Sequence, residues 1–262
     1  MSDALAIAAT GMKAQQFHLD TVAHNLANLK TNGFKAGRVQ FFDLMGSRAM
    51  AQAELGDIGL SAMPAGSMGL GVGVGAMSRF FGMGELQATD SAFDLAVRGE
   101  GFLEVLLPDG RSAYTRGGSL TMDAQGLLST AEGHPLKAGI HLPVGMQRLV
   151  LEPDGQVLAQ VAGQTQAIDL GRLDLVQFAN PQGLIPWGDG LYVASAAAGE
   201  PRVKRPGEEG LGTMAQGHLE ASNVKMIDEM LNLMVAQRSY EANVKVAQAA
   251  DEVLGLINGL RR

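Results

Sequence analysis

Apolar residues recur at helical spacing at both ends of the chain, whereas the middle carries short apolar runs separated by turn residues. Near the N-terminus the steps alternate between three and four residues, which is the a/d spacing of a helix that packs along a seam. The apolar members of this first stripe are Leu5, Ala8, Met12, Leu19, Val22, Leu26 and Leu29. Near the C-terminus a second stripe consists of Ile227, Leu231, Met234, Val246, Ala250, Val253, Ile257 and Leu260. The pattern predicts one long amphipathic helix at each end.

The first helix is expected to end in a motif rich in Asn and Gly. Asn28, Thr31 and Gly33 gather there, and Asn and Gly tolerate the left-handed conformation that stops a helix. We count Asn25 and Phe34 as part of the same helix-end motif.

Glycine alternates with aliphatic residues from Gly69 to Gly75, which places all of these glycines on one face of a strand. A phosphate-binding loop is a weak interpretation, because no Lys-Ser or Lys-Thr pair follows. The favoured interpretation is a flat strand whose glycine face lets another backbone approach closely.

The segment from Phe80 to Val203 has the pattern of an all-β domain. Short apolar runs such as 94–97, 102–107 and 173–178 are separated by turns with Asp109, Asp123 and Asp154. This spacing indicates a small sandwich or an irregular barrel of hairpins.

Together these patterns predict the α+β class, with the two long terminal helices paired as a coiled-coil-like unit, a central all-β domain and an extended connecting loop. The expected terminal helical domain comprises residues 1–33 and 222–262. A connector with the extended loop would occupy 34–79 and 204–221, and the β domain 80–203.

Composition narrows the possible functions. The net charge of -7, with 20 scattered basic residues, argues against a nucleic-acid binder. The chain has no cysteine, so disulfides and thiolate metal sites are excluded. The N-terminus lacks the pattern of a cleavable signal peptide, and no apolar run is long enough to span a membrane. We therefore expect no membrane insertion.

Candidate catalytic residues are sparse. Asp109, Asp123 and Asp154 each belong to a β-turn signature, which favours a turn over acid/base chemistry. The histidines lack the spacing of a metal site, and no serine has a nucleophile-elbow frame. Trp187 is expected to fill the core or a turn. We predict no catalytic residue, no cofactor and no bound metal.

Both chain ends carry motifs that resemble the bacterial flagellar axial proteins, the family of rod and hook subunits. At the N-terminus these are Ala8-Ala-Thr-Gly-Met12, Ala23-His-Asn-Leu-Ala-Asn28 and Thr31-Asn-Gly-Phe-Lys35. At the C-terminus they are Gly217-His-Leu-Glu-Ala-Ser-Asn-Val224 and Gln237-Arg-Ser-Tyr-Glu-Ala-Asn243. Arg98-Gly-Glu-Gly-Phe102 and the segment 106–116 resemble the β domain of a distal rod subunit, and the chain length suits such a subunit better than a hook subunit.

The resemblance implies a structural subunit of the distal rod that polymerises helically into a hollow drive shaft, transmits torque from motor to hook and encloses the export channel. The implied partners are copies of itself, the proximal rod proteins, the hook subunit, the P- and L-ring bushing proteins and the flagellar type III export apparatus. The implied location is the basal body, where the rod crosses the periplasm, with export independent of a cleavable signal peptide. Both terminal helices are expected to be largely disordered before assembly.

Periodicity alone leaves open whether the helical stripes pack within one chain or between copies, and the resemblance favours packing between copies. The expected assembly interface is Leu5, Met12, Leu19, Val22, Leu26, Ile227, Leu231, Met234, Val246, Val253 and Ile257. Alternatives are another axial paralogue (a proximal rod or hook subunit), a β-domain enzyme acting on cell-wall glycan with dimerising helices, and a ligand-binding module.

Overall fold

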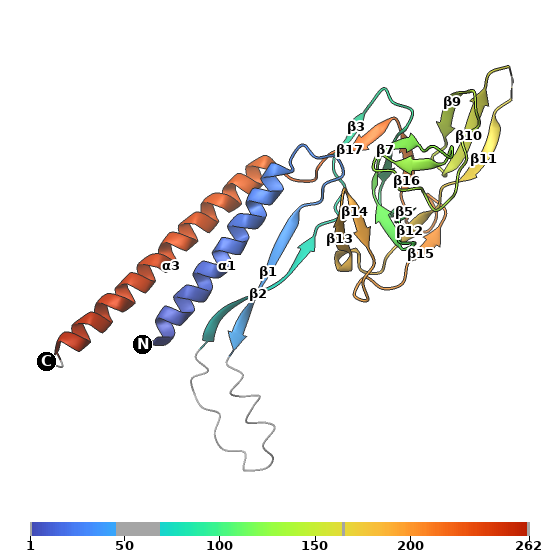
Figure 1. Cartoon of the computed structure of the whole chain (residues 1–262). Coiled ribbons are helices and arrows are strands. Elements are labelled where there is room, and N and C mark those ends of the chain that lie inside the picture. Colours follow the sequence, from blue (N-terminus) through green and yellow to red (C-terminus); the bar gives the residue numbers. More distant parts are fainter. Residues whose placement is uncertain (1, 46–68, 164–165, 261–262) are drawn as a thin grey trace, which may run out of the picture. The chain divides into compact units, whose positions relative to one another are not determined.

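The computed structural model describes residues 2–45, 69–163 and 166–260, which divide into two compact units (Figure 1). Unit 1 comprises residues 1–26, 37–78 and 225–262, and unit 2 comprises 27–36 and 79–224. The chain is α+β, as the sequence predicts: the helices belong to unit 1 and most strands to unit 2. The polypeptide passes between the units after residues 26, 36, 78 and 224.

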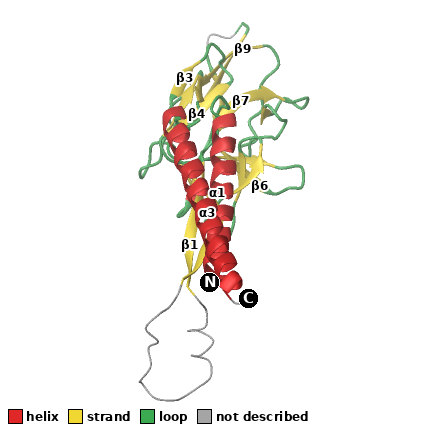
Figure 2. Cartoon of the chain, turned by 90° about the vertical axis from the view of Figure 1, so that its left-hand side faces the viewer, coloured by secondary structure: helices red, strands yellow, loops and turns green. Residues whose placement is uncertain are grey.

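Unit 1 consists of two long helices and a two-stranded ribbon. Helix α1 (Ser2–Ala27) and helix α3 (Met226–Leu260) lie side by side in both views (Figures 1 and 2). Strands β1 (Gly37–Met45) and β2 (Gly69–Arg79) pair with each other. The end of α1 and the glycine strand within β2 agree with the sequence prediction. The greater part of the expected extended loop, residues 46–68, lies outside the described residues.

Unit 2 is built from short strands in several small sheets. One sheet has the order β13-β14-β6-β5 and a second the order β16-β4-β7-β8. The remaining groups are β11-β10-β9, β12-β15 and β17-β3. The strands are β3 (Leu86–Ala88), β4 (Asp94–Arg98), β5 (Leu103–Leu106), β6 (Ser112–Thr115), β7 (Gly117–Met122), β8 (Leu128–Thr130), β9 (Met146–Leu151), β10 (Gln156–Val161), β11 (Ile168–Arg172), β12 (Leu175–Gln177), β13 (Ile185–Gly188), β14 (Leu191–Val193), β15 (Arg202–Lys204), β16 (Thr213–Gln216) and β17 (His218–Glu220), with a 3-10 turn at Pro181–Gly183.

Two apolar clusters form the core of unit 2. The larger cluster is aliphatic and joins the second sheet to β5 and β10, with Leu95, Leu103 and Val157 almost completely buried. The smaller cluster is aromatic, and Phe102, Tyr114 and Phe178 meet in it edge to face. Alternation of apolar and polar residues turns Leu103 and Val105 of β5 inward, whereas β4 is buried at four successive positions.

The compact units divide the chain differently from the three domains expected from sequence. Residues 204–221 were expected to connect domains, but they contribute β16 and β17 to unit 2, where these strands pair with β4 and β3. Residues 27–36, which follow the first helix, also belong to unit 2. The predicted and observed boundaries differ because these residues form hydrogen bonds with strands that are distant in the sequence. A local sequence pattern contains no information about such pairing.

Candidate assembly interface

The stripe predicted on α1 is shielded within the single subunit. Val22 is 2% exposed and Ala8 3% exposed, and Leu5, Met12, Leu19 and Leu26 are all partly buried. The a/d spacing therefore identified the covered face of this helix.

Three elements of unit 1, namely α3, β1 and β2, contact α1. On one side, Gly11 lies against α3 so closely that an added Cβ would lie 2.9 Å from Asn243 Nδ2. On another side, the His18 ring meets the Phe41 ring of β1 edge to face, with 5.9 Å between centroids. The Val72 amide of β2 donates a hydrogen bond to Thr10 Oγ1 (3.2 Å). Helix α1 is thus the central element of unit 1.

The glycine face of β2 accommodates parts of the same chain. A Cβ at Gly71 would collide with Thr10 of α1, and one at Gly73 would collide with the Phe42 ring. The close approach expected from the glycine pattern is therefore present: side chains approach Gly71 and Gly73, and at Gly75 an added Cβ would lie 3.2 Å from the backbone carbonyl oxygen of Gln40.

Helix α3 has a shielded seam, of which the sequence pattern had named only Ala250. Ala236 is fully buried, and Leu233, Asn243, Ala247, Ala250 and Leu254 are partly buried. These positions advance in steps compatible with a heptad, so they share one face of the helix. The heptad spacing of these residues is visible in the sequence. Larger apolar side chains also occupy other faces of α3, and the prediction was based on those.

The stripe predicted on α3 is exposed. Ile227 is 74% exposed and Leu231 51% exposed, and Met234, Val246 and Val253 are also open to solvent. At 3.6 residues per turn, Ile227, Leu231 and Met234 lie on the side of α3 opposite Ala236, whereas Val246 and Val253 lie at the flank of the seam. Further exposed apolar side chains on α3 are Met226, Met230, Val235 and Leu256. Ile257 lies within α3, but its side chain is outside the described part of the structure.

The residues of the helix-end motif fix the chain as it leaves α1. Asn25 is 2% exposed and makes a reciprocal pair of hydrogen bonds with Gly37: Asn25 Nδ2 donates to the carbonyl (3.0 Å) and Asn25 Oδ1 accepts from the amide (2.8 Å). Thr31 Oγ1 donates to Asn28 Oδ1 (3.1 Å). Gly33 has a φ of 71°, the left-handed conformation that the sequence led us to expect.

Phe34, the last member of this motif, is held in unit 2. The Arg79 guanidinium lies over its ring, 5.2 Å from the centroid. The Gly33 amide donates to the carbonyl of Glu220 (2.6 Å). The segment leading out of α1 is therefore docked beside the segment leading into α3.

The turn aspartates act as turn residues. Asp109 Oδ1 accepts from the Arg111 amide (3.0 Å), Asp123 Oδ1 from the Gln125 amide (2.9 Å), and Asp154 Oδ1 from the Gln156 amide (3.1 Å). The hydrogen bonds from Arg111 lower the pKa of Asp109 and favour the ionised carboxylate. This confirms the turn interpretation of all three.

Trp187 was expected to fill the core or a turn, and the expectation of a core position was wrong. The indole is 53% exposed on β13, the edge strand of its sheet, and the Arg111 guanidinium lies 4.8 Å from its ring centroid. Because an indole stacked against a cation retains a favourable environment at the surface, this tryptophan does not require burial.

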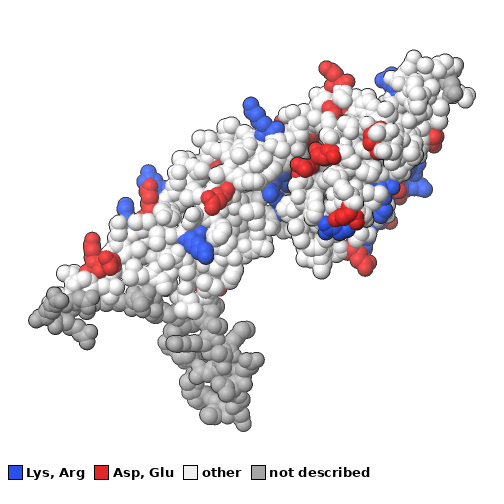
Figure 3. Space-filling model, viewed as in Figure 1, with Lys and Arg blue, Asp and Glu red and all other residues white. Residues whose placement is uncertain are grey.

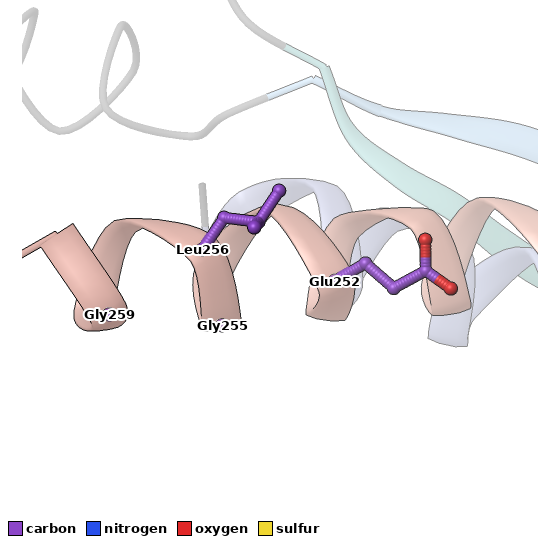
Figure 4. A pocket seen from close by; sticks show the side chains of 4 residues that line it. All are labelled: Glu252, Gly255, Leu256 and Gly259. Carbon is purple, nitrogen blue, oxygen red and sulfur yellow. The ribbon is translucent and has the colours of Figure 1, made fainter.

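The described residues contain no group of three or more His, Asp or Glu side chains placed to hold a metal ion. A hollow on α3 is lined by Glu252, Gly255, Leu256 and Gly259, all from one helix (Figure 4). One carboxylate cannot orient a small ligand as a set of convergent polar groups does. On the face shown in Figure 3, acidic and basic side chains are interspersed.

Within the described residues, no helix is both long and apolar enough to cross a membrane.

Three family models match consecutive parts of the chain. "Flagella basal body rod protein" matches residues 5–35, "Flagellar hook protein FlgE/F/G D1 domain" matches 96–159, and "Flagellar basal body rod FlgEFG protein C-terminal" matches 215–260. The first of these segments covers most of α1, and the last contains α3.

Curated relatives match the chain over nearly its whole length. The flagellar basal-body rod protein FlgG of Buchnera aphidicola subsp. Schizaphis graminum is 39% identical over 99% of this chain and 100% of its own length. FlgG of Borreliella burgdorferi is 38% identical over 100% of both chains. FlgG of Caulobacter vibrioides is 37% identical over 98% of this chain and 99% of its own length.

Proposed function

The chain belongs to the FlgG family of flagellar basal-body rod proteins and is a structural subunit of the rod; on this premise we propose that it polymerises helically into a hollow drive shaft. In this proposal the shaft transmits torque from motor to hook, and the flagellar export channel runs through it. We propose that the chain forms the distal part of the rod.

The observation that carries the proposal is the second apolar face of α3. The seam containing Ala236 is covered within the subunit, whereas the stripe containing Ile227 and Leu231 is open. Exposed contiguous apolar surface on a soluble protein marks an interaction site. The occupant we propose for this stripe is unit 1 of a neighbouring copy.

The two faces of α3 have different tasks in this proposal. Its seam pairs with α1 in a coiled-coil-like arrangement inside each subunit, which the close approach of Gly11 to Asn243 supports. Its opposite stripe packs on the next subunit. Because a contact between different surfaces of identical chains does not close on itself, it generates a helical filament.

The residues proposed for the assembly interface fall into two classes. Ile227, Leu231, Met234, Val246 and Val253, which are exposed in the single subunit, contact the neighbouring subunit, and Ile257 is the last residue of the proposed set. Leu5, Met12, Leu19, Val22 and Leu26 shape the covered face of α1 and hold α3 in place. Asn25 and Gly37 fix the exit of the chain from α1.

The function is mechanical, and we propose that the chain catalyses no reaction. The proposed partners beyond its own copies are the proximal rod proteins, the hook subunit, the P- and L-ring bushing proteins and the flagellar type III export apparatus. The rod subunit acts in the basal body, and we place it where the rod crosses the periplasm, reached by export as an unfolded chain through the flagellar export apparatus.

Replacement of the native copy by a chain with an epitope inserted at Gly163, in the β10–β11 hairpin, tests the position in the rod. Electron microscopy of isolated hook-basal bodies, with an antibody against the epitope, should label the rod between its proximal part and the hook. Label on the hook, or on the proximal rod alone, would instead assign the chain to another axial paralogue.

Limited proteolysis of the dilute subunit tests whether assembly orders the helices. We expect both terminal helices to open locally and to be cleaved first, leaving a resistant fragment that contains residues 79–224 of unit 2. Uniform resistance of the whole chain would mean that intramolecular packing of α1 and α3 suffices to order them.

A further inference from the structure

In unit 2, a buried ion cluster joins the segment that follows α1 to the segment that precedes α3. Lys35 Nζ lies 2.7 Å from Glu220 Oε1, and the side chains are 0% and 2% exposed. Arg116 Nε lies 3.4 Å from Glu220 Oε2 and is similarly buried. Lys35 follows the end of α1, Glu220 precedes α3, and Arg116 belongs to the body of the β unit.

Backbone groups complete the coordination of these three side chains. Lys35 Nζ also donates to the carbonyl of Gly82 (3.0 Å), and the Gly84 amide donates to Glu220 Oε1 (2.7 Å). Arg116 donates to the carbonyls of Gly101 (2.6 Å), Gly99 (2.5 Å) and Val97 (3.1 Å). Every charge of the cluster therefore has partners from at least two separate segments.

Asn223 binds the same segments a few residues away. Its Oδ1 accepts from the Ala36 amide (2.8 Å), and its Nδ2 donates to the carbonyls of Phe80 (2.7 Å) and Gly82 (3.0 Å). We call Lys35, Arg116, Glu220 and Asn223 the clasp. We call residues 33–36 the N-terminal root and residues 220–224 the C-terminal root.

Glu220 supplies the negative charge that balances the buried cations of Lys35 and Arg116. Among the described residues it is the carboxylate that lies within ion-pair distance of Lys35 and of Arg116. Two buried cations without a counter-ion are strongly unfavourable. Burial lowers the pKa of Lys35, whereas Glu220 opposes that shift. The N-terminal root is therefore stable in its docked position only when the C-terminal root is present.

We propose that Glu220 makes the docking of both roots onto unit 2 one cooperative step, so that neither helix is anchored to the β unit before the other. The chain passes between the units after residues 36, 78 and 224, within a few positions of clasp contacts. Force on either helix thus reaches unit 2 through the clasp as well as through the covalent chain.

Cooperative docking of the two roots would benefit a subunit that reaches the rod unfolded, and this role rests on the proposed function. A chain threaded in either direction delivers Lys35 and Glu220 at different times, because 185 residues separate them. Until both have arrived, neither helix is anchored, and premature polymerisation is disfavoured. The cooperativity itself is a property of the isolated subunit and does not depend on export.

Hydrogen-exchange mass spectrometry of the full-length protein tests the clasp. In Glu220→Gln we expect exchange in both roots and at residues 80–85 to rise together by roughly ten- to a hundredfold, because a buried charge loses its partner. Residues 146–161, in β9 and β10, should keep wild-type rates. A rise confined to the C-terminal root, with residues 33–36 unchanged, would overturn the proposal.

Glu209→Gln is the matched control. Glu209 also accepts a hydrogen bond from a lysine of unit 2, Lys204, but its side chain is 72% exposed. Removal of that charge should leave exchange in both roots unchanged. If hydrogen exchange in both roots rose equally in this control, the change in Glu220→Gln would be an effect of net charge, and the clasp would be rejected.

Two further measurements keep the test decisive if Glu220→Gln does not fold. Lys35→Met removes one cation and leaves Arg116 paired, and it should raise exchange in the C-terminal root as well as in its own. In the wild-type protein, native-state exchange against denaturant should give both roots the same opening free energy and denaturant dependence. Roots that open independently would refute the clasp, whereas failure of subunits to polymerise would bear on the proposed function alone.

Discussion

The exposed stripe of α3 permits a substitution that separates folding from assembly. Leu231 lies near the middle of the densest part of this stripe, and half of its surface is open to solvent in the single subunit. We predict that Leu231→Asp leaves the isolated subunit folded and abolishes rod assembly. The matched control is Asn232→Asp, which adds one negative charge at the adjacent exposed position of the same helix.

The magnitudes follow from the exposed fraction. Complete burial of a leucine side chain is worth about 1.5–3 kcal/mol, so about half of that remains to be gained when a neighbouring copy covers Leu231. In the free subunit the substitution costs roughly 1–2 kcal/mol, mostly from lost burial and helix propensity. At a covered contact, desolvation of the new carboxylate adds several kcal/mol. Association should therefore weaken by about a thousandfold or more.

The assay compares the two variants in a strain that lacks the native subunit. Circular dichroism of the purified proteins should show near-wild-type helix content and a melting temperature lowered by a few degrees in Leu231→Asp. Electron microscopy of isolated basal bodies should show complete rods with Asn232→Asp and truncated rods with Leu231→Asp. Normal rods and swimming with Leu231→Asp would refute the assignment of this stripe to the subunit contact.

Three other substitutions test separate parts of the structure. Gly84→Ala should lower the free energy of unfolding by about 2 kcal/mol or more, measured by urea denaturation, because the new Cβ would collide with the carbonyl of Ala221; a neutral result would contradict the close approach. Gly255→Ala, in α3 with open space around the added Cβ, should instead raise helix stability by roughly 0.5–1 kcal/mol in the same measurement. Tyr192→Phe should flatten the alkaline stability profile. Burial raises the pKa of Tyr192 to about 12, so between pH 10 and 12 the unfolded chain loses this proton while the native protein keeps it. Native stability should therefore fall by roughly 2–3 kcal/mol across that range in the wild type. An identical fall in the Phe variant would assign the effect to other groups.

The sequence by itself determined the class of the fold and the position of its helices. Steps of three and four residues from Leu5 to Leu26 predicted one apolar face on α1, and that face is shielded in the subunit, because a helix turns through a fixed angle per residue. Turn residues such as Asp109 and Asp154 were equally readable, since their side chains bond to backbone two residues away. The end motifs also identified the family, because they preserve residue identities rather than patterns.

Only the tertiary structure decided which apolar face of α3 is covered and which side chains join the segment after α1 to the segment before α3. Helix α3 carries apolar residues on two opposite faces, and periodicity cannot rank a face with Ala236 against one with Leu231. Trp187 was misplaced because its cation partner, Arg111, comes from a distant turn. Lys35 and Glu220 both stand in recognisable motifs, but their ion pair exists only because strand pairing brings remote segments together. Local patterns report what a residue does to its neighbours in sequence, whereas burial and ion pairing depend on which distant segments the fold makes adjacent.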